Sequence, residues 1–144
     1  MRFWDPSALL ALVFDDPRRA PALRILEADD RMAVWWGTSV EYVSAVARRE
    51  REGDLTPGDA AAALERMTAL SRLWHEVQPS RHIKRTAHRL LRVHPLHAAD
   101  SLQLAAAIAA AEGDPPSLDF VCFDARLGSA ASREGFPILT ARTG

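Results

Sequence analysis

The sequence of 144 residues contains one cysteine and one lysine, and each scarcity excludes a class of site or of protein. A single thiol, Cys122, excludes an intrachain disulfide and a zinc site built from several thiolates. Lys84 falls in the middle of a predicted helix, whereas a receiver-type signalling domain needs a lysine at the end of a strand. We therefore discount that class of acidic α/β protein.

The sequence also lacks a long apolar run. The first apolar stretch, residues 8–14, is short and is followed directly by Asp15 and Asp16. The alanine-rich stretch near residue 105 is interrupted by Gln103 and Glu112. Neither stretch resembles a signal peptide or a membrane span, so we expect a cytoplasmic protein with no membrane partner.

The overall composition is that of a folded globular chain. About half of the residues are hydrophobic (48%) and a quarter are charged (26%), and the length suits one domain over residues 1–144. The net charge of −1 leaves the class of partner open. Nearly all basic residues are arginine, which suits phosphate contacts but also follows from a GC-rich genome.

Short apolar strands alternate with helices along the chain. The expected strands cover residues 2–5, 32–36, 119–123 and 137–139, with a brief one at 76–78. The expected helices cover residues 8–14, 21–28, 39–52, 57–73, 80–93 and 124–134, and a further helix carries Asp100 in its first turn and runs to about residue 111. This alternation predicts an α/β fold with a mainly parallel central sheet of four or five short strands flanked by helices.

Periodicity also predicts which side chains face the core. Trp35 and Trp36 lie in a continuously apolar strand, the pattern of a strand covered on both faces. In two helices a 3.6-residue period predicts the inward set Val40, Val43, Val46, Ala47, Ile83, Ala87, Leu90 and Leu91.

Four acidic residues recur where helices begin. Asp5, Glu41 and Asp124 lie at or shortly after strand ends, and Asp100 lies in the first turn of its helix. Each has an ordinary explanation as a turn residue, a helix cap or a partner of the helix dipole. Glu41, for example, completes a capping-box pattern with Thr38.

Their shared position favours a common site. In an open parallel sheet such junctions meet at the carboxyl edge of the strands, where these folds bind ligands. Clustered carboxylates repel one another unless a cation or protons compensate, and hard divalent cations prefer oxygen ligands. The pattern predicts Mg²⁺ or Mn²⁺ rather than zinc, and such ions serve phosphodiester hydrolysis well.

The segments that carry these acids also resemble a known family. They are Trp4-Asp5-Pro6-Ser7-Ala8-Leu9-Leu10, Ser39-Val40-Glu41-Tyr42 with Ala47-Arg48-Arg49-Glu50, Ala99-Asp100-Ser101-Leu102-Gln103-Leu104-Ala105, and Val121-Cys122-Phe123-Asp124-Ala125-Arg126-Leu127. In this order and spacing, over essentially the whole chain, they resemble the PIN-domain ribonucleases. The resemblance is greatest to the VapC toxins of type II toxin–antitoxin systems.

The resemblance implies a PIN-like three-layer fold and a metal-dependent endoribonuclease. It implies that Asp5, Glu41, Asp100 and Asp124 are both the catalytic residues and the ligands of Mg²⁺ or Mn²⁺, which activates a water that attacks the RNA phosphodiester. It further implies a homodimer and a cognate VapB-like antitoxin that blocks the acidic pocket.

Two departures from the family pattern leave an alternative open. Pro6 stands where the family often has a small or hydroxyl residue, and Cys122 replaces a common Ser or Thr. Without that hydroxyl, Asp124 loses an expected neighbouring group that would help to position it. Asp119 is a possible substitute for Asp124 in the site, but as the first residue of a strand it is better suited to a solvated position. The alternative is a non-catalytic PIN-like module that binds RNA or protein.

Candidate RNA contacts gather on the helix over residues 80–93. Its basic face, at helical spacing, consists of Arg81, Lys84, Arg85, His88, Arg89 and Arg92. This face either tracks RNA phosphates or is simply solvated. Ser7, just after Asp5, is a further candidate contact near the metal, whereas a structural role is expected for His97.

Overall fold

In the computed structural model, which describes residues 1–141, five short parallel strands form the central sheet. The last residues of the predicted domain, 142–144, lie outside the described part. The strands are β1 (Arg2–Trp4), β2 (Met32–Trp35), β3 (His75–Val77), β4 (Asp119–Val121) and β5 (Ile138–Leu139). Their order across the sheet is β3-β2-β1-β4-β5, and every neighbouring pair is parallel. The predicted α/β class and parallel sheet are confirmed.

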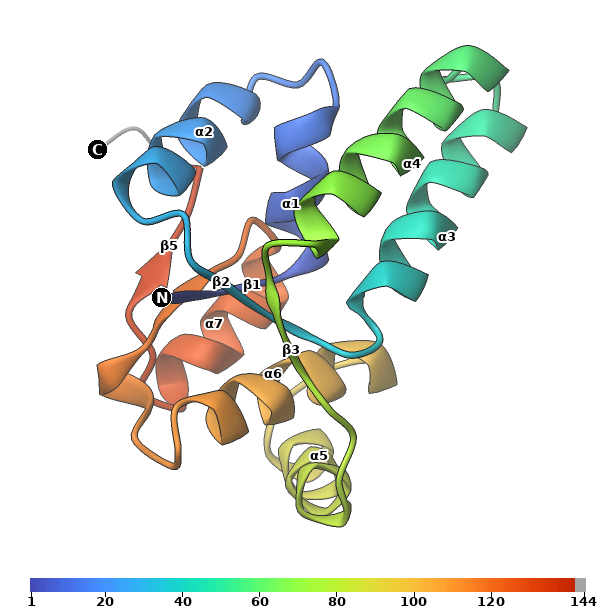
Figure 1. Ribbon diagram of the computed structural model, residues 1–144. Helices are drawn as coiled ribbons and strands as arrows, with labels where there is room; N and C mark the ends of the chain where they lie inside the picture. Colours follow the sequence, from blue (N-terminus) through green and yellow to red (C-terminus); the bar gives the residue numbers. More distant parts are fainter. Residues whose placement is uncertain (142–144) are drawn as a thin grey trace.

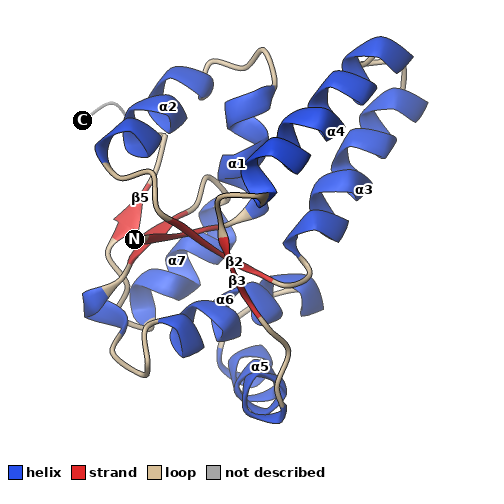
Figure 2. Cartoon of the chain, in the orientation of Figure 1, coloured by secondary structure: helices blue, strands red, loops and turns tan. Residues whose placement is uncertain are grey.

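Helices make up most of the described chain (Figure 2). They are α1 (Pro6–Val13), α2 (Arg19–Ala28), α3 (Thr38–Arg51), α4 (Pro57–Ser71), α5 (Arg81–Val93), α6 (Ala98–Ala110) and α7 (Ala125–Arg133), with a 3₁₀ turn at Pro115–Ser117. The helices α1 to α4 lie on one side of the sheet and α5 to α7 on the other (Figure 1). Within residues 1–141, no helix combines the length and the apolar character needed to cross a bilayer.

Alternating side chains of the central strands supply two cores. Phe3, Ala33 and Phe120 belong to the cluster that also contains buried residues of α5, α6 and α7. Their neighbours Trp4, Val34 and Val121 belong to the cluster with α1, α3 and α4. Because successive strand residues point to opposite faces, this alternation explains why the strands read as continuously apolar.

The helix starts differ slightly from those expected. The first helix begins at Pro6, with Asp5 rather than Ser7 as its N-cap, because the Asp5 carboxylate accepts the Ser7 N–H. Proline at the first helical position is compatible with this earlier start. The fourth strand ends at Val121, two residues before the expected end, so Phe123 lies in the loop that leads to α7.

Several side chains expected in the core are exposed instead. Trp36 lies beyond the end of β2 and is 51% exposed, so its assignment to the core was wrong. Val40, 67% exposed, and Val43 are also outside the core, because α3 packs through Thr38, Tyr42 and Val46. On α5 the buried residues are Ile83, Ala87 and Leu90, whereas Leu91 faces solvent.

Candidate functional site

Asp5 is the most deeply buried of the four predicted site acids, with an exposed fraction of 5%. It follows the central strand β1 directly. Its Oδ2 atom accepts hydrogen bonds from the Ser7 backbone N–H at 3.0 Å and from the Ser7 hydroxyl at 2.5 Å. The Ser7 hydroxyl oxygen in turn accepts the Phe123 N–H at 3.0 Å. Ser7 therefore ties Asp5 to the loop after β4.

The pKa of Asp5 is raised from 3.8 to about 7, chiefly by burial and also by the charges of Glu41 and Asp100. The hydrogen bonds from Ser7 oppose this shift and do not overcome it. A buried carboxylate with two acidic neighbours needs a proton or a cation near neutral pH. Asp5, Glu41 and Asp100 thus form one electrostatic group at the carboxyl edge of the sheet.

Glu41 is held by a residue that the sequence reading did not select. The expected capping box with Thr38 is absent, since α3 has Gly37 at its N-cap. Instead, the Gln103 Nε2 group donates to Glu41 Oε2 at 2.6 Å and to Thr38 Oγ1 at 2.9 Å. Burial and the Asp100 charge raise the pKa of Glu41, and the Gln103 bond opposes them.

Gln103 itself is fully buried, and this was detectable as a polar residue inside an alanine-rich helix. Its amide oxygen Oε1 is buried and has no hydrogen-bond partner among residues 1–141. An oxygen acceptor is therefore left over beside Glu41. Such an atom is normally paired with a donor, an ordered water or an ion.

A Gln103→Leu substitution is expected to lower the free energy of unfolding by about 1–3 kcal/mol, because Glu41 and Thr38 lose their shared donor. Urea unfolding would measure this. Gln78→Leu is the matched control, since Gln78 is exposed and bonds only to nearby Glu76 within the described chain. Equal stability of the two variants would show that the Gln103 bonds contribute nothing.

Asp100 lies in the first turn of α6 and is half-buried. Its Oδ2 atom accepts the His97 N–H at 3.3 Å, as the third residue of a capping box. Figure 1 shows the N-terminal ends of α3 and α6 at the same end of the sheet. The charge of Asp100 contributes to the raised pKa of Glu41 and to that of Asp5, which agrees with this arrangement.

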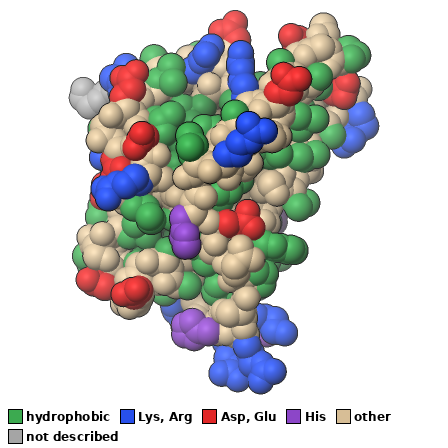
Figure 3. Space-filling model, viewed as in Figure 1, with side chains coloured by type: hydrophobic (Ala, Val, Ile, Leu, Met, Phe, Trp, Pro, Cys, Tyr) green, Lys and Arg blue, Asp and Glu red, His purple; other side chains and the backbone are tan. Residues whose placement is uncertain are grey.

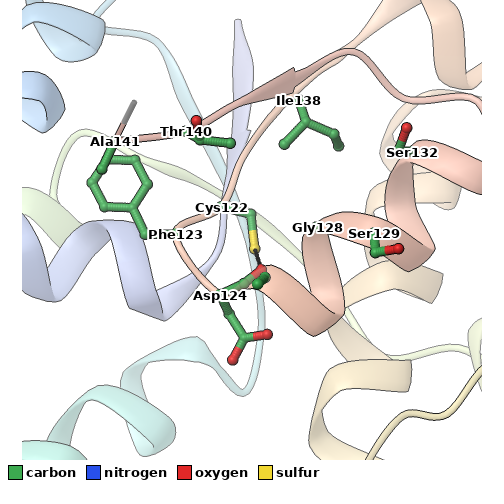
Figure 4. A pocket seen from close by; sticks show the side chains of 10 residues that line it. Cys122, Phe123, Asp124, Gly128, Ser129, Ser132, Ile138, Thr140 and Ala141 are labelled. Carbon is green, nitrogen blue, oxygen red and sulfur yellow. Dashed lines mark hydrogen bonds between the residues drawn. The ribbon is translucent and has the colours of Figure 1, made fainter. Parts of the chain in front are cut away.

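Asp124 is the exposed member of the four acids. It is the N-cap of α7, where its Oδ1 atom accepts the Leu127 N–H at 2.9 Å, as its cap explanation predicted. Its carboxylate points away from Ile138 and Thr140 (Figure 4). Asp119, the possible substitute for Asp124, starts β4 at the opposite edge of the sheet and pairs with Arg2.

Cys122 links Asp5 and Asp124. Its Sγ atom lies 3.9 Å from Asp5 Oδ2 and 3.3 Å from the Asp124 carbonyl oxygen, and the second contact is drawn in Figure 4. Burial, followed by the charge of Asp5, raises the pKa of the thiol well above its usual range. Cys122 therefore remains protonated and acts as a weak donor in the place of a hydroxyl.

The acidic group supplies carboxylate oxygens, which are the ligands that hard divalent cations prefer. Among residues 1–141, no three His, Cys, Asp or Glu side chains are grouped so that they could hold an ion together. Each carboxylate is engaged with its own donor instead. Mg²⁺ is usually bound by one or two carboxylates together with waters and substrate phosphate. Asp5 and Asp100 fit that requirement.

A cavity of about 530 Å³ lies beside Asp124, between the loop after β4, β5 and α7 (Figure 4). The sequence reading did not anticipate it. Most of its lining is apolar, and α7 contributes the hydroxyls of Ser129 and Ser132. The other lining residues include Phe123, Gly128 and Ile138. Cys122, which contacts Asp5, also lines this cavity.

The basic face predicted on α5 is exposed. Lys and Arg side chains gather over α5 at the lower end of the molecule in Figure 3. Arg81, Lys84, Arg85 and Arg92 are exposed, as expected for either a phosphate track or a solvated face. Arg89 differs, because its guanidinium pairs with Glu134 at 2.8 Å and is engaged within the protein.

Comparison with known proteins identifies the fold. Neither a protein-family model nor a curated protein matches the chain. A chain of a toxin–antitoxin complex from Klebsiella pneumoniae is similar in structure, with a TM-score of 0.68 and 17% identity over 99% of this chain and 98% of that one. PAE2754 from Pyrobaculum aerophilum has a TM-score of 0.64 and 20% identity over 96% and 83% of the two chains. The protein therefore shares its fold with a chain of a bacterial toxin–antitoxin complex.

Proposed function

We propose that the protein is a Mg²⁺- or Mn²⁺-dependent endoribonuclease of the VapC-like PIN type. The observation that carries this proposal is the buried carboxylate of Asp5, whose pKa is raised to about 7 by burial and by Glu41 and Asp100. A buried carboxylate with acidic neighbours lowers the stability of the fold, and acids with strongly perturbed pKa values cluster at functional sites.

Asp5 and Asp100 would be the principal metal ligands, with Glu41 and Asp124 completing the site or orienting the water. When bound, the ion neutralises the phosphate and lowers the pKa of the attacking water. Gln103 orients the Glu41 carboxylate, and Ser7 fixes that of Asp5. The exposed Asp124 borders the site on the side open to RNA.

The test is incubation of total cellular RNA with the purified protein in Mg²⁺, in Mn²⁺ and in EDTA. We expect discrete fragments with either metal and intact RNA in EDTA, and the fragment ends identify the substrate. Salt-sensitive RNA binding without cleavage in either metal would favour the alternative, a non-catalytic RNA-binding module. Calorimetric titration showing no metal binding would leave the four acids with structural roles alone and overturn the proposal.

We also propose an antitoxin partner. The support is the structural similarity to a chain from a toxin–antitoxin complex. A VapB-like antitoxin that covers the acidic group would exclude both metal and RNA. Inhibition of cleavage at an equimolar ratio is the expected result, and inhibition that leaves Mn²⁺ binding unchanged would place the partner elsewhere.

A homodimer is the third part of the proposal, supported by an exposed apolar stripe. Val40 and Val43 lie at i and i+3 near the start of α3, Trp36 lies two residues before that helix, and all three are exposed. Soluble proteins seldom leave such a patch uncovered. We expect this stripe to pack against its copy.

A Val40→Asp substitution is expected to weaken that dimer at least thirtyfold, about 2 kcal/mol or more, because it places a charge in the apolar contact. Light scattering over a dilution series would measure the effect. Leu73→Asp is the control, because Leu73 is highly exposed and lies after α4, away from the stripe. A monomeric wild type, or equal effects of both variants, would contradict the prediction.

A further inference from the structure

A small cavity between α7 and the segment joining α5 to α6 is lined by cationic side chains. Its volume is about 170 Å³, and its lining residues are His94, Pro95, Arg126, Ser129, Ala130 and Arg133. Arg126, Ser129 and Arg133 recur at positions i, i+3 and i+7, so they share one face of α7. By liquid volume the cavity corresponds to roughly five or six waters, which suits a hydrated phosphate rather than a whole ligand of drug size.

The two arginines of this cavity are not neutralised within the described chain. Arg2, Arg18, Arg31 and Arg89 have carboxylate partners, whereas neither Arg126 nor Arg133 has one in residues 1–141. Glu134, which follows Arg133 directly, is engaged with Arg89 at 2.8 Å and with His94 at 2.7 Å. The cavity therefore presents a net positive charge.

Arg126 is also held in position. One of its guanidinium nitrogens lies 2.9 Å from His97 Nε2. Because arginine is always protonated, it donates this bond and the His97 nitrogen accepts it. The His97 backbone N–H, in turn, donates to Asp100. A short chain of contacts thus connects the cavity to the acidic group, and the remaining N–H groups of Arg126 are available to an acceptor.

The position of the cavity fits the proposed substrate. Arg126 lies in the first turn of α7, two residues after the N-cap Asp124, and His97 is three residues before Asp100. The start of α7 therefore carries both an acid and a cation, and the cation contacts His97 at the start of α6. RNA presents phosphates in regular succession, so a strand whose scissile phosphate lies at the acids places a neighbouring phosphate within reach of arginines next to them.

We propose that Arg126 and Arg133, with the Ser129 hydroxyl, bind the RNA phosphate adjacent to the one that is cleaved. The inference rests on the proposed ribonuclease function and adds residues absent from the predicted RNA contacts. Arginine presents a planar set of donors that matches phosphate geometry. Glu134 connects this cavity to Arg89 of α5, so the basic face of α5 continues the same path away from the acids.

Fluorescence anisotropy with a labelled single-stranded RNA, in EDTA so that metal-dependent cleavage cannot proceed, tests the proposal. Arg126→Gln and Arg133→Gln are each expected to weaken binding about tenfold at low salt and to lower the slope of log affinity against log salt by about 0.7. Arg24→Gln on α2 is the matched control, because it removes the same charge from an exposed site on the other side of the sheet. Thermal unfolding of each variant checks that the fold is retained.

If the two cavity variants bind RNA as Arg24→Gln does, the phosphate site is overturned. Parallel cleavage assays in Mn²⁺ keep the two proposals distinct. If the wild type cleaves RNA and the variants bind RNA as the wild type does, only the proposed phosphate site is overturned. If the wild type neither binds nor cleaves RNA, both the phosphate site and the ribonuclease function are overturned.

Discussion

Asp100→Asn protein is expected to cleave RNA at least a hundredfold more slowly than wild type in Mg²⁺ or Mn²⁺ while remaining folded. An amide of the same shape keeps the half-buried position but loses the charge that would bind a cation. Loss of groups that only support metal ligands costs 10–100-fold, so loss of a ligand costs at least about a hundredfold. Initial rates on a mapped RNA fragment, normalised to folded protein, measure the effect.

The matched control is Asp59→Asn. Asp59 occupies the third position of the Thr56 capping box at the start of α4, the same local role that Asp100 has after His97 in α6. If Asp100 merely caps its helix, both variants lose a few tenths to about 1 kcal/mol of stability and cleave RNA equally. A fully active Asp100→Asn protein would remove Asp100 from the site.

Asp5→Asn is expected to stabilise the metal-free protein at alkaline pH. The pKa of Asp5 in the folded protein, about 7, lies above its ordinary value of 3.8. The folded state therefore holds a proton that the unfolded chain releases, and stability present below pH 4 is lost as the pH rises through 7. The shift corresponds to a penalty on the order of 4 kcal/mol at pH 8, which a neutral amide avoids.

Urea unfolding in EDTA between pH 4 and pH 8.5 measures this effect. The wild type should lose stability with rising pH through this range, and Asp5→Asn should show a flatter profile and exceed it at pH 8. Asp16→Asn should change stability in the opposite direction, since hydrogen bonds from Arg18 hold the pKa of Asp16 below its usual range. That variant should be less stable than wild type at pH 8. If the stability of the wild type and of Asp5→Asn changed with pH in the same way, the raised pKa of Asp5 would be contradicted.

Mg²⁺ or Mn²⁺ should offset the same penalty in the wild type, because a bound cation replaces the proton. The gain in melting temperature on adding metal is expected to be larger at pH 8 than at pH 5 and to be much reduced in Asp5→Asn. The comparison separates metal binding at this carboxylate from nonspecific binding elsewhere on the surface.

The succession of strands and helices and the parallel sheet were predictable because they depend on local patterns. Alternation of apolar segments with capped helices predicted the parallel α/β sheet, and parallel strands bring the residues after β1 and β2 to one edge. Asp124 as an N-cap follows from the same local chemistry. Burial of Asp5, by contrast, depends on how α1, β4 and α6 surround it.

Contacts between distant side chains were not predictable from patterns. Glu41 matches a capping box in sequence, yet its partner is Gln103, 62 residues away. Likewise, 3.6-residue periodicity placed Val40 in the core, whereas α3 turns Tyr42 inward, and the Tyr42 hydroxyl bonds to Ala63 of α4. A periodic pattern describes an apolar side of a helix but not which neighbour covers it.

The sheet order has a consequence for synthesis of the chain. β1 lies between β2 and β4, and Arg2 pairs in register with Asp119, 117 residues later. A ribosome therefore completes Asp5 long before Asp100, before the strand β4 that pairs with β1, and before Asp124, which follows β4. The four acids can meet only after residue 124 has left the exit tunnel, so the acidic group assembles late in the synthesis of the chain.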